Sequence, residues 1–585
     1  MVFEKDGFKV ISDLDTKVQV KVLSDEDHVK CTLVEFTFDK VNETEERKLI
    51  VEHSFVATDI AGRWHPCAAA DRSVKPDWFD GTASMAAISA PIICYFNADS
   101  QNRRTIALSE IKQKAVMKYG VHEEDGTMQC HTEVMLPIGY AKDTYELKIW
   151  ESTEDGPYWE AIAKAAKWWE EELNLPIMEV PDIARDTMYS FWYSQHQEVS
   201  AQSVEAESAL AAKLGFTSVI VDDGWQTDDH SRGYSTCGDW EPCEAKFPDM
   251  AAHIKKVQDM GLKYLMWFSV PFLGKKSKAW ETFKDKTLCF DDFQKAAVLD
   301  LRYPEVREHL KAVYRKAVKE WGLDGLKLDF IDEVYLRPES PVYKEGMDYA
   351  DIQDALDAFL TEVMEELRAI RPDIMIEFRQ KYIGPQIRKY GNLLRVIDCP
   401  MSGLSNRVGT IDLRMLSGNT AVHADMLMWN ENEKPEDAAL QVISCIFSTA
   451  QISVDLSKIT PEMETMLRFW MKFMKNHKML LQTAQIQPLE PENLYPQVMV
   501  EDEDTRIQVC YSKGRIVNLK EIPKTFYYVH GTKEEDVVFC MKDGQNINWE
   551  VVDCMGTVLE SGKWMNERFG EIKVPTSGMV KIEMI

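Results

Sequence analysis

PEVREHLKAVYRKAVKEWGLDGLKLDF, residues 304–330, joins a helical stretch to a short apolar run. Residues 304–322 carry apolar side chains at helical spacing, and GLKLDF at residues 325–330 has the length and composition of a buried strand. The same alternation of helical stretches and short apolar runs continues in both directions from about residue 186 onward. Repeated units of this kind indicate a parallel sheet whose strands are connected by helices.

Eight apolar runs are candidate strands of this sheet. Eight strands over about 290 residues fit a closed (β/α)8 barrel better than an open sheet. The runs are YSFWYS (189–194), SVIVDDGW (218–225), KYLMWFSV (263–270), GLKLDF (325–330), IMIEFR (374–379), LLRVIDC (393–399), AVHADML (421–427) and ISVDL (452–456).

The segments on either side of the barrel have a different pattern. KVQVKVL (17–23) and TYELKIW (144–150) alternate apolar and polar residues, as in an antiparallel β-sandwich, and the pattern returns near the C-terminus. PYWEAIAKAAKWWEEELNL (157–175) has helical spacing. The predicted fold class is therefore multidomain, with a central (β/α)8 TIM barrel. The predicted domains are an N-terminal β-sandwich (1–155), a linker helix (156–185), the (β/α)8 barrel (186–482) and a C-terminal antiparallel β-domain (483–585).

Charge and cysteine content exclude several classes of partner. The formal net charge of −29 argues against nucleic acid and anionic membrane surfaces, which require basic patches. The N-terminal residues lack the basic and apolar regions of a signal peptide, and no apolar run is long enough to span a membrane. The twelve cysteines include no CxxC pair. These features predict a cytoplasmic protein with reduced thiols and no zinc site.

Acidic and large polar side chains gather where the candidate strands end, and function sits at this end of such barrels. One Asp after a strand is commonly a helix cap, but several acids at one barrel mouth repel each other and need a chemical reason. The side chains are Asp222, Asp223, Trp225, Trp267, Lys327, Asp329, Glu377, Arg379, Asp398, His423 and Asp425.

Glycoside hydrolysis with retention is a chemistry that such a mouth can serve. One carboxylate attacks the anomeric carbon, and a second carboxyl group protonates the leaving oxygen and then activates water. Lys327 and Asp329 are two residues apart on one strand, so their side chains face the same side. The lysine is expected to keep Asp329 ionised, as a nucleophile requires.

Taken together, the motifs resemble glycoside hydrolase family 36, the α-galactosidases and their relatives. The resemblance covers the whole barrel, and the flanking β-domains follow the order of that family. The motifs are LGFTSVIVDDGWQ (214–226), GDWEPCEAKFPDM (238–250), GLKYLMWF (261–268), VLDLRYPEV (298–306) and GLDGLKLDF (322–330).

The resemblance implies a role for each candidate residue. Asp329 lies in the Lys-x-Asp motif of the family nucleophile, and Asp398 falls at the spacing of its acid/base. Asp222 and Asp223 match the pair that binds outer sugar hydroxyls, O4 and O6 in galactose. The implied substrate-binding residues are Asp222, Asp223, Trp267, Lys327, Arg379, Tyr382, Arg407, Trp192 and Trp225.

The chain departs from the family pattern in two segments, and the first of them leaves the identity of the sugar open. EFRQKYIG (377–384) stands where the family has a Cys-Ser-Gly-Gly-Gly-Arg-like segment, and RVID (395–398) replaces its Trp-x-Ser-Asp strand end. α-Galactose in short oligosaccharides is the first choice. α-N-acetylgalactosamine and an anionic hexose held by Arg379 or Lys381 are alternatives. The nearby acids Asp332 and Glu333 are expected to support the site.

Two alternative functions would use the same residues. A sugar-binding barrel without catalysis would not need Lys327, Asp329 and Asp398 together, so their joint presence favours an enzyme. Transfer of the sugar to another sugar hydroxyl, in place of water, is a rival within catalysis. No metal or organic cofactor is expected. The expected partner is a small oligosaccharide or glycoside, and the sequence leaves a homo-oligomer open.

Overall fold

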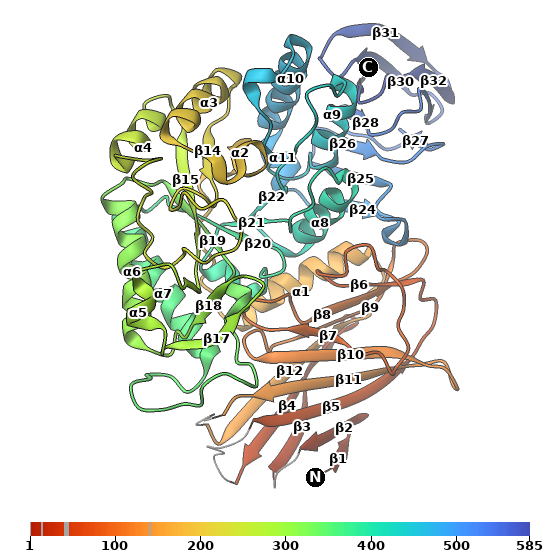
Figure 1. Ribbon diagram of the computed structural model, residues 1–585. Helices are drawn as coiled ribbons and strands as arrows, with labels where there is room; N and C mark the ends of the chain where they lie inside the picture. The colour runs from red at the N-terminus through yellow and green to blue at the C-terminus, as the bar shows by residue number, and fades with distance from the viewer. Residues whose placement is uncertain (1, 13–15, 40–45, 139, 141) are drawn as a thin grey trace. The chain divides into compact units, whose positions relative to one another are not determined.

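The computed structural model describes residues 2–12, 16–39, 46–138, 140 and 142–585 (Figure 1). The chain divides into two compact units. The first comprises Met1–Val180, Asp222–Ile254 and Leu265–Leu394. The second comprises Pro181–Val221, Lys255–Tyr264 and Arg395–Ile585.

Within the described part of the first unit, the N-terminal strands form two antiparallel sheets. Their inward residues, such as Val20, Phe36 and Met117, make one hydrophobic core, and outward residues alternate with them along each strand. One sheet has the order β1(Val2–Lys5), β2(Phe8–Ser12), β5(Arg47–Val56), β11(Thr127–Leu136), β10(Lys114–His122), β7(Thr82–Ser84). The other has the order β3(Thr16–Glu26), β4(Val29–Phe38), β12(Thr144–Ser152), β9(Asn102–Leu108), β8(Ile92–Phe96), β6(Gly62–Trp64).

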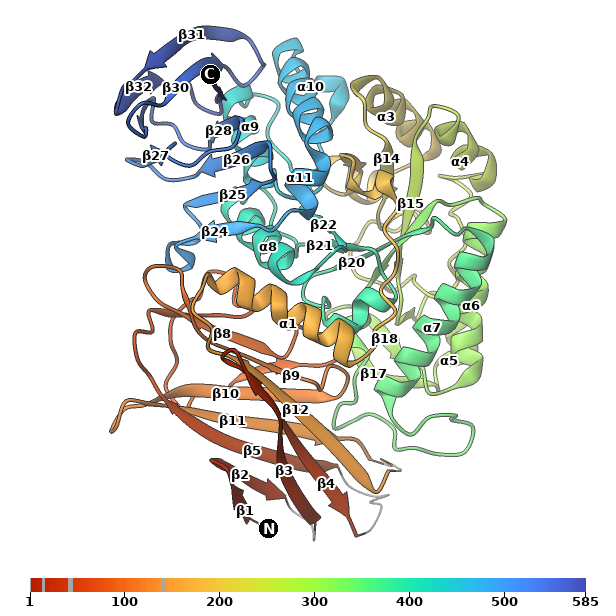
Figure 2. The same ribbon diagram turned by 180° about the vertical axis from the view of Figure 1, so that it is seen from behind.

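Helix α1(Tyr158–Glu172) follows the sandwich and packs against β8 and β9 (Figure 2). Its apolar stripe, including Trp159, Ile162 and Trp169, is buried, and Nε1 of Trp169 donates to the carbonyl oxygen of Leu108 at 2.7 Å. The sequence prediction of a helix in this segment is confirmed. Burial of one apolar stripe supplies most of the stability of such a helix.

The central sheet contains the eight predicted strands, and the prediction of a (β/α)8 barrel between β-domains is confirmed. Strands such as β19 are buried at every position, because the barrel interior and the helices cover both faces. A parallel bridge between His423 and Thr449 joins β22 to the chain beside β23. The sheet order is β22(Ala421–His423), β21(Leu393–Arg395), β20(Met375–Arg379), β19(Gly325–Asp329), β15(Lys263–Ser269), β14(Ser218–Val221), β13(Met188–Ser190), β23(Gln451–Ile452).

Helices connect these strands. In the first unit α6 and α7 pack on each other, and their apolar faces are buried. The helices are α2(Trp192–Gln195), α3(Ala201–Leu214), α4(Met250–Gln258), α5(Ala279–Phe283), α6(Pro304–Lys319), α7(Ile352–Ile370), α8(Gly403–Leu416), α9(Pro435–Ser444), α10(Pro461–Asn476) and α11(Lys478–Thr483).

A small antiparallel sheet follows β15 and was not predicted. Its order is β16(Phe272–Gly274), β18(Ala296–Leu299), β17(Thr287–Asp291), and its register shifts between Thr287 and Cys289. The strands are short and β17 is only partly buried, so the sequence shows no clear alternation there.

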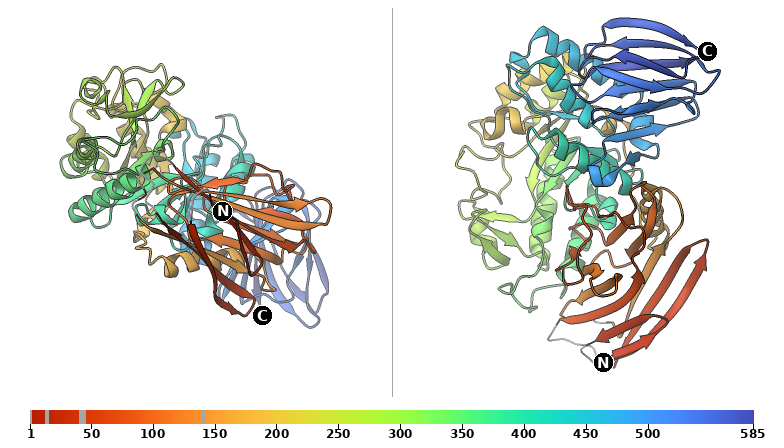
Figure 3. Two further views of the ribbon diagram at one scale, coloured as in Figure 1. Left: turned by 90° about the horizontal axis from the view of Figure 1, so that it is seen from below. Right: turned by 90° about the vertical axis from the view of Figure 1, so that its right-hand side faces the viewer.

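The C-terminal strands of the second unit form two sheets that share one core, with Val517, Phe539 and Ile582 among its members (Figure 3). The larger sheet has the order β24(Gln487–Leu489), β25(Gln497–Glu501), β26(Thr505–Cys510), β28(Thr525–His530), β33(Met579–Met584), β30(Asn546–Val552), β31(Val558–Met565). The smaller sheet contains β27(Ile516–Asn518), β29(Asp536–Cys540) and β32(Phe569–Lys573).

The domain boundaries at residues 155, 185 and 482 stay predictions. Among the described residues, no helix is both long and apolar enough to cross a membrane.

Candidate active site

Asp329 lies at the carboxyl end of β19, and its buried carboxylate is surrounded by hydrogen-bond donors. Oδ1 accepts from the backbone N–H of Phe330 at 2.9 Å, from Nε of Arg379 at 2.8 Å and from the hydroxyl of Tyr382. Oδ2 accepts from Nε1 of Trp267 at 3.0 Å. Burial alone would raise the pKa of Asp329, but the charge of Arg379 and these hydrogen bonds hold that pKa well below its usual range. Asp329 is therefore ionised near neutral pH.

Lys327 forms its ion pair with Asp222, which directly follows β14. Both side chains are buried. The charge of Lys327 also lowers the pKa of Asp329, so the expected help in keeping Asp329 ionised acts through space, while the contact goes to Asp222. Burial raises the pKa of Asp222, and the charge of Lys327 opposes the rise.

Asp223 is buried beside Asp222. Its backbone N–H donates to Oδ1 of Asp222 at 3.0 Å, and its own Oδ1 accepts from Nε2 of Gln226 at 2.6 Å. The two adjacent carboxyl groups are thus fixed by short-range contacts at the end of β14. Carboxyl groups held in this way are suited to specific recognition of hydroxyl groups.

Two of the three predicted tryptophans, Trp225 and Trp267, are buried. Trp225 and Trp267 are 0% and 1% exposed, and Nε1 of Trp225 donates to the carbonyl oxygen of Trp267 at 2.9 Å. Trp267 orients Asp329 and stacks on Tyr234, with ring centroids 5.8 Å apart. Tyr234 comes from the loop after β14 and is not among the predicted site residues. Nothing in the spacing of that loop marks the residue.

Asp332 and Glu333 lie just after β19, in the short helical turn η3(Ile331–Glu333), and have different surroundings. Glu333 pairs with Arg337 at 2.5 Å. Asp332 is buried, and its Oδ1 has no hydrogen-bond partner among the described residues. Burial raises the pKa of Asp332 to about 6; the charge of Arg379 opposes the rise, and the charge of Asp329 adds to it.

In the second unit, Asp398 belongs to a charge network after β21 that also contains Arg395 and Asp425. Arg395 donates to Oδ1 of Asp398 at 2.8 Å and to Oδ1 of Asp425 at 2.6 Å. Asp425 also accepts from the hydroxyl of Tyr193 at 3.0 Å and from the backbone N–H of Cys399 at 2.6 Å. The side chain of Asp398 is 52% exposed, whereas that of Asp425 is fully buried. Burial raises the pKa of Asp425, with the charge of Arg395 opposing the rise.

Two predicted substrate-binding residues make other contacts. Arg407 donates to the carbonyl oxygen of Leu494 at 3.1 Å, and its guanidinium group lies 4.3 Å from the ring centroid of Tyr511. The ring of Trp192 stacks on His196 with centroids 3.7 Å apart. Arg407 therefore supports packing onto the C-terminal segment. Within the described chain, no group of three or more His, Cys, Asp or Glu side chains is arranged to hold a metal ion.

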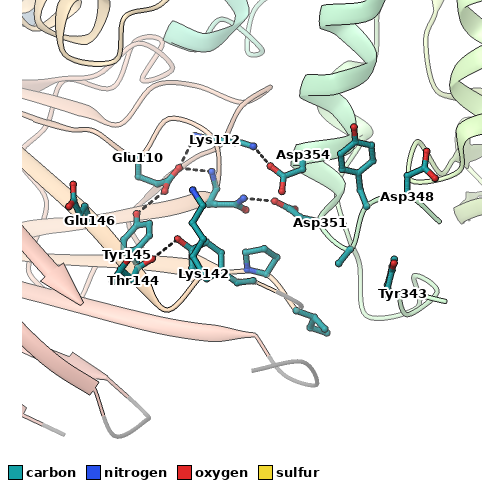
Figure 4. Close-up of a pocket in the computed structure, with 16 residues that line it drawn as sticks. Glu110, Lys112, Lys142, Thr144, Tyr145, Glu146, Tyr343, Asp348, Asp351 and Asp354 are labelled. Carbon is teal, nitrogen blue, oxygen red and sulfur yellow. Dashed lines mark hydrogen bonds and ion pairs between the residues drawn. The ribbon is translucent and has the colours of Figure 1, made fainter. Parts of the chain in front are cut away.

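A cavity of about 1030 Å³ opens elsewhere in the first unit, between the sandwich and the start of α7 (Figure 4). Lys112 pairs with Asp354 there, and Gln113 donates to Asp351. The predicted site residues do not line it. Its polar groups largely bind each other, which links the sandwich to α7.

Comparisons with known proteins agree with this fold. The family model described as Melibiase matches residues 182–380. The solved α-galactosidase AgaA of Geobacillus stearothermophilus, of glycoside hydrolase family 36, superimposes with a TM-score of 0.67 at 14% identity over 99% of this chain and 83% of that chain. The galactosidase domain of the α-galactosidase–sucrose kinase AgaSK gives a TM-score of 0.63 at 12% identity, over 100% of this chain and 83% of that chain. By fold and strand-end chemistry, the chain is a glycosidase-like barrel protein.

Two relatives found by sequence similarity are named as α-galactosidases. α-Galactosidase Mel36A of Lactobacillus acidophilus is 25% identical over 228 residues, 35% of this chain and 30% of that protein. The bifunctional α-galactosidase/sucrose kinase AgaSK of Mediterraneibacter gnavus is 24% identical over 202 residues, 33% of this chain and 20% of its own length. The matches thus span less than a third of these relatives. The expected resemblance to the family 36 α-galactosidases is confirmed.

Proposed function

We propose that the protein is a retaining α-glycosidase that releases terminal α-galactose from short oligosaccharides. The observation that carries the proposal is the state of Asp329, an ionised carboxylate fixed by donors on both oxygens at the end of a barrel strand. The names of the relatives support the substrate, as does the complex of AgaA with raffinose. A cytoplasmic location remains part of the proposal.

The proposed mechanism uses two carboxyl groups. Asp329 attacks the anomeric carbon and forms a covalent glycosyl–enzyme, which water then hydrolyses. Asp398 protonates the leaving oxygen and afterwards activates the water. The solvent exposure of Asp398 supports this role, because an acid/base must exchange its proton with the medium in each cycle. Asp425 is less suited to this role, since its carboxylate is fully buried and already accepts several hydrogen bonds.

The charges around Asp329 favour a neutral sugar over an anionic hexose. Arg379 is paired with Asp329, and Lys327 is paired with Asp222. Both cations are thus already compensated, and the additional buried carboxyl groups of Asp223 and Asp332 would repel a carboxylate on the substrate. α-N-Acetylgalactosamine is neutral and stays the alternative substrate.

Kinetics on a panel of aryl glycosides tests this proposal. We expect the α-galactoside to be hydrolysed at least ten times faster than the α-glucoside, the α-glucuronide and the α-N-acetylgalactosaminide, because a site built on hydroxyl contacts discriminates strongly. Proton NMR at early times should show α-galactose first. A β-anomer appearing first contradicts retention. No hydrolysis of any glycoside on the panel favours a sugar-binding role without catalysis. Disaccharide products would instead indicate transglycosylation.

A further inference from the structure

Asp332 is a buried carboxyl group beside Asp329 to which the proposed mechanism gives no task. Its residue is 7% exposed, and Oδ1 finds no hydrogen-bond partner in the described part of the chain. Buried polar atoms in native proteins are nearly always hydrogen-bonded, and an exception needs an explanation. The adjacent Glu333, by contrast, has a partner for its carboxylate, because it pairs with Arg337 at 2.5 Å.

Charged groups face Asp332 from two strand ends. Asp329 and Glu333 belong to its own segment after β19, while Arg379 and Lys381 come from the segment at the end of β20. Nε of Arg379 is engaged by Asp329 at 2.8 Å, and its Nη1 donates to the carbonyl oxygen of Gln380 at 3.3 Å. The nearby cations therefore moderate the charge of Asp332, while its Oδ1 keeps its acceptor capacity for another donor.

We propose that Asp332 accepts a hydrogen bond from a hydroxyl group of the bound glycoside and selects substrates that carry this hydroxyl. A hydroxyl donor satisfies Oδ1, whereas an anionic substituent would meet like charge from Asp332 and Asp329. This inference rests on the proposed function and adds a specificity residue to it. It also gives the site a contact outside the Asp222–Asp223 pair.

The contact has a defined pH dependence. With a pKa of about 6 in the free protein, Asp332 is protonated below pH 6 and ionised above it. Hydrogen bonds to an ionised acceptor are the stronger ones, so the ionised form binds the hydroxyl better. The value of kcat/KM should rise through pH 6. Since the bound hydroxyl favours the ionised form, the corresponding limb of kcat should lie at lower pH.

The test compares Asp332→Asn with the matched control Glu333→Gln, using 4-nitrophenyl α-galactoside between pH 4.5 and 8. We expect Asp332→Asn to lower kcat/KM at pH 7.5 by about 10- to 100-fold, the range of one charge-assisted hydrogen bond, and to remove the limb near pH 6. Glu333→Gln should keep the limb. An Asp332→Asn protein with the wild-type profile and rate overturns the inference.

A second measurement needs only the wild-type protein. Monodeoxy analogues of 4-nitrophenyl α-galactoside remove one hydroxyl at a time. For one analogue the kcat limb should move up to about pH 6, the position that it has in kcat/KM, because the contact is gone. Identical kcat limbs across all analogues overturn the inference while the proposed function stands. No hydrolysis of the parent glycoside overturns both.

Discussion

Nε of Arg379 lies 2.8 Å from Oδ1 of Asp329, so the carboxylate proposed as nucleophile is held in an ion pair by a residue of the neighbouring strand. The side chains are only 14% and 9% exposed, so water screens the pair weakly. The arginine makes Asp329 a weaker base and a better leaving group. In the proposed mechanism, this arrangement would favour breakdown of the glycosyl–enzyme.

Removal of Arg379 should destabilise the protein through Asp329. In Arg379→Met the buried carboxylate loses its partner, and breaking such a pair costs about 3–5 kcal/mol. Asp329→Asn combined with Arg379→Met should recover at least about 2 kcal/mol of this loss, because no unpaired charge is left. Urea unfolding of the two single variants and the double variant at pH 7 measures the coupling energy.

The pH dependence of the stability provides a control on this comparison of single and double variants. The lowered pKa of Asp329 contributes stability that is present above its unfolded value near 4 and is lost as pH falls through the folded pKa. In Arg379→Met the loss of the positive charge raises the folded pKa of Asp329, so the stability difference from wild type should be largest at neutral pH and shrink as pH falls through that raised pKa. A difference that grows with acid contradicts this account.

Three carboxyl substitutions distinguish the nucleophile from the acid/base. Asp329→Asn should lose nearly all turnover on every substrate. Asp398→Asn should lose at least about 100-fold on melibiose but less than about 10-fold on a dinitrophenyl α-galactoside, whose leaving group needs little protonation. Asp425→Asn should slow both substrates by a similar factor. If Asp425→Asn shows the leaving-group dependence and Asp398→Asn does not, the acid/base assignment moves to Asp425.

Much of the fold could be predicted from the sequence because barrel strands are buried on both faces. GLKLDF and KYLMWFSV are nearly continuous apolar runs, and the two-residue strand β23 overlaps the predicted run ISVDL at Ile452. The inserted sheet β16–β18–β17 escaped prediction, since its strands are short, β17 is partly exposed and the pairing of β17 with β18 contains a register shift.

The strand-end acids of the candidate site could be predicted from the sequence. The ion pairs that their side chains make could not. A spacing of two residues puts Lys327 and Asp329 on one side of β19, but it does not reveal that Asp222 lies closer to the amine. Arg379 was expected to touch the sugar, and its contact with Asp329 was not foreseen. Such pairings depend on side-chain direction across neighbouring strands, which a single sequence does not carry.

Tyr382→Phe should affect the second chemical step more than the first. The Tyr382 hydroxyl donates to Oδ1 of Asp329, which stabilises the carboxylate both before attack and as the leaving group of deglycosylation. We expect kcat on activated aryl galactosides to fall by about 10-fold and KM to fall in parallel, with kcat/KM changed by less than about 3-fold. Stopped-flow mixing should show a nitrophenol burst. Tyr234→Phe is the control, and an equal fall of kcat and kcat/KM without a burst contradicts the prediction.

Arg395→Met should make stability strongly dependent on pH through Asp425. Asp425 is fully buried, and burial already raises its pKa although Arg395 opposes the rise. Without the arginine that pKa should rise further. A group whose folded pKa is raised contributes stability below its unfolded pKa and loses it as pH rises through the folded value. The variant should therefore approach wild-type stability near pH 4 and lose about 3–5 kcal/mol by pH 8. Thermal unfolding at intervals from pH 4 to pH 8 measures this, with Arg395→Met/Asp425→Asn as the control that should remove the dependence. A deficit that is constant across the range would mean that Arg395 acts by packing alone.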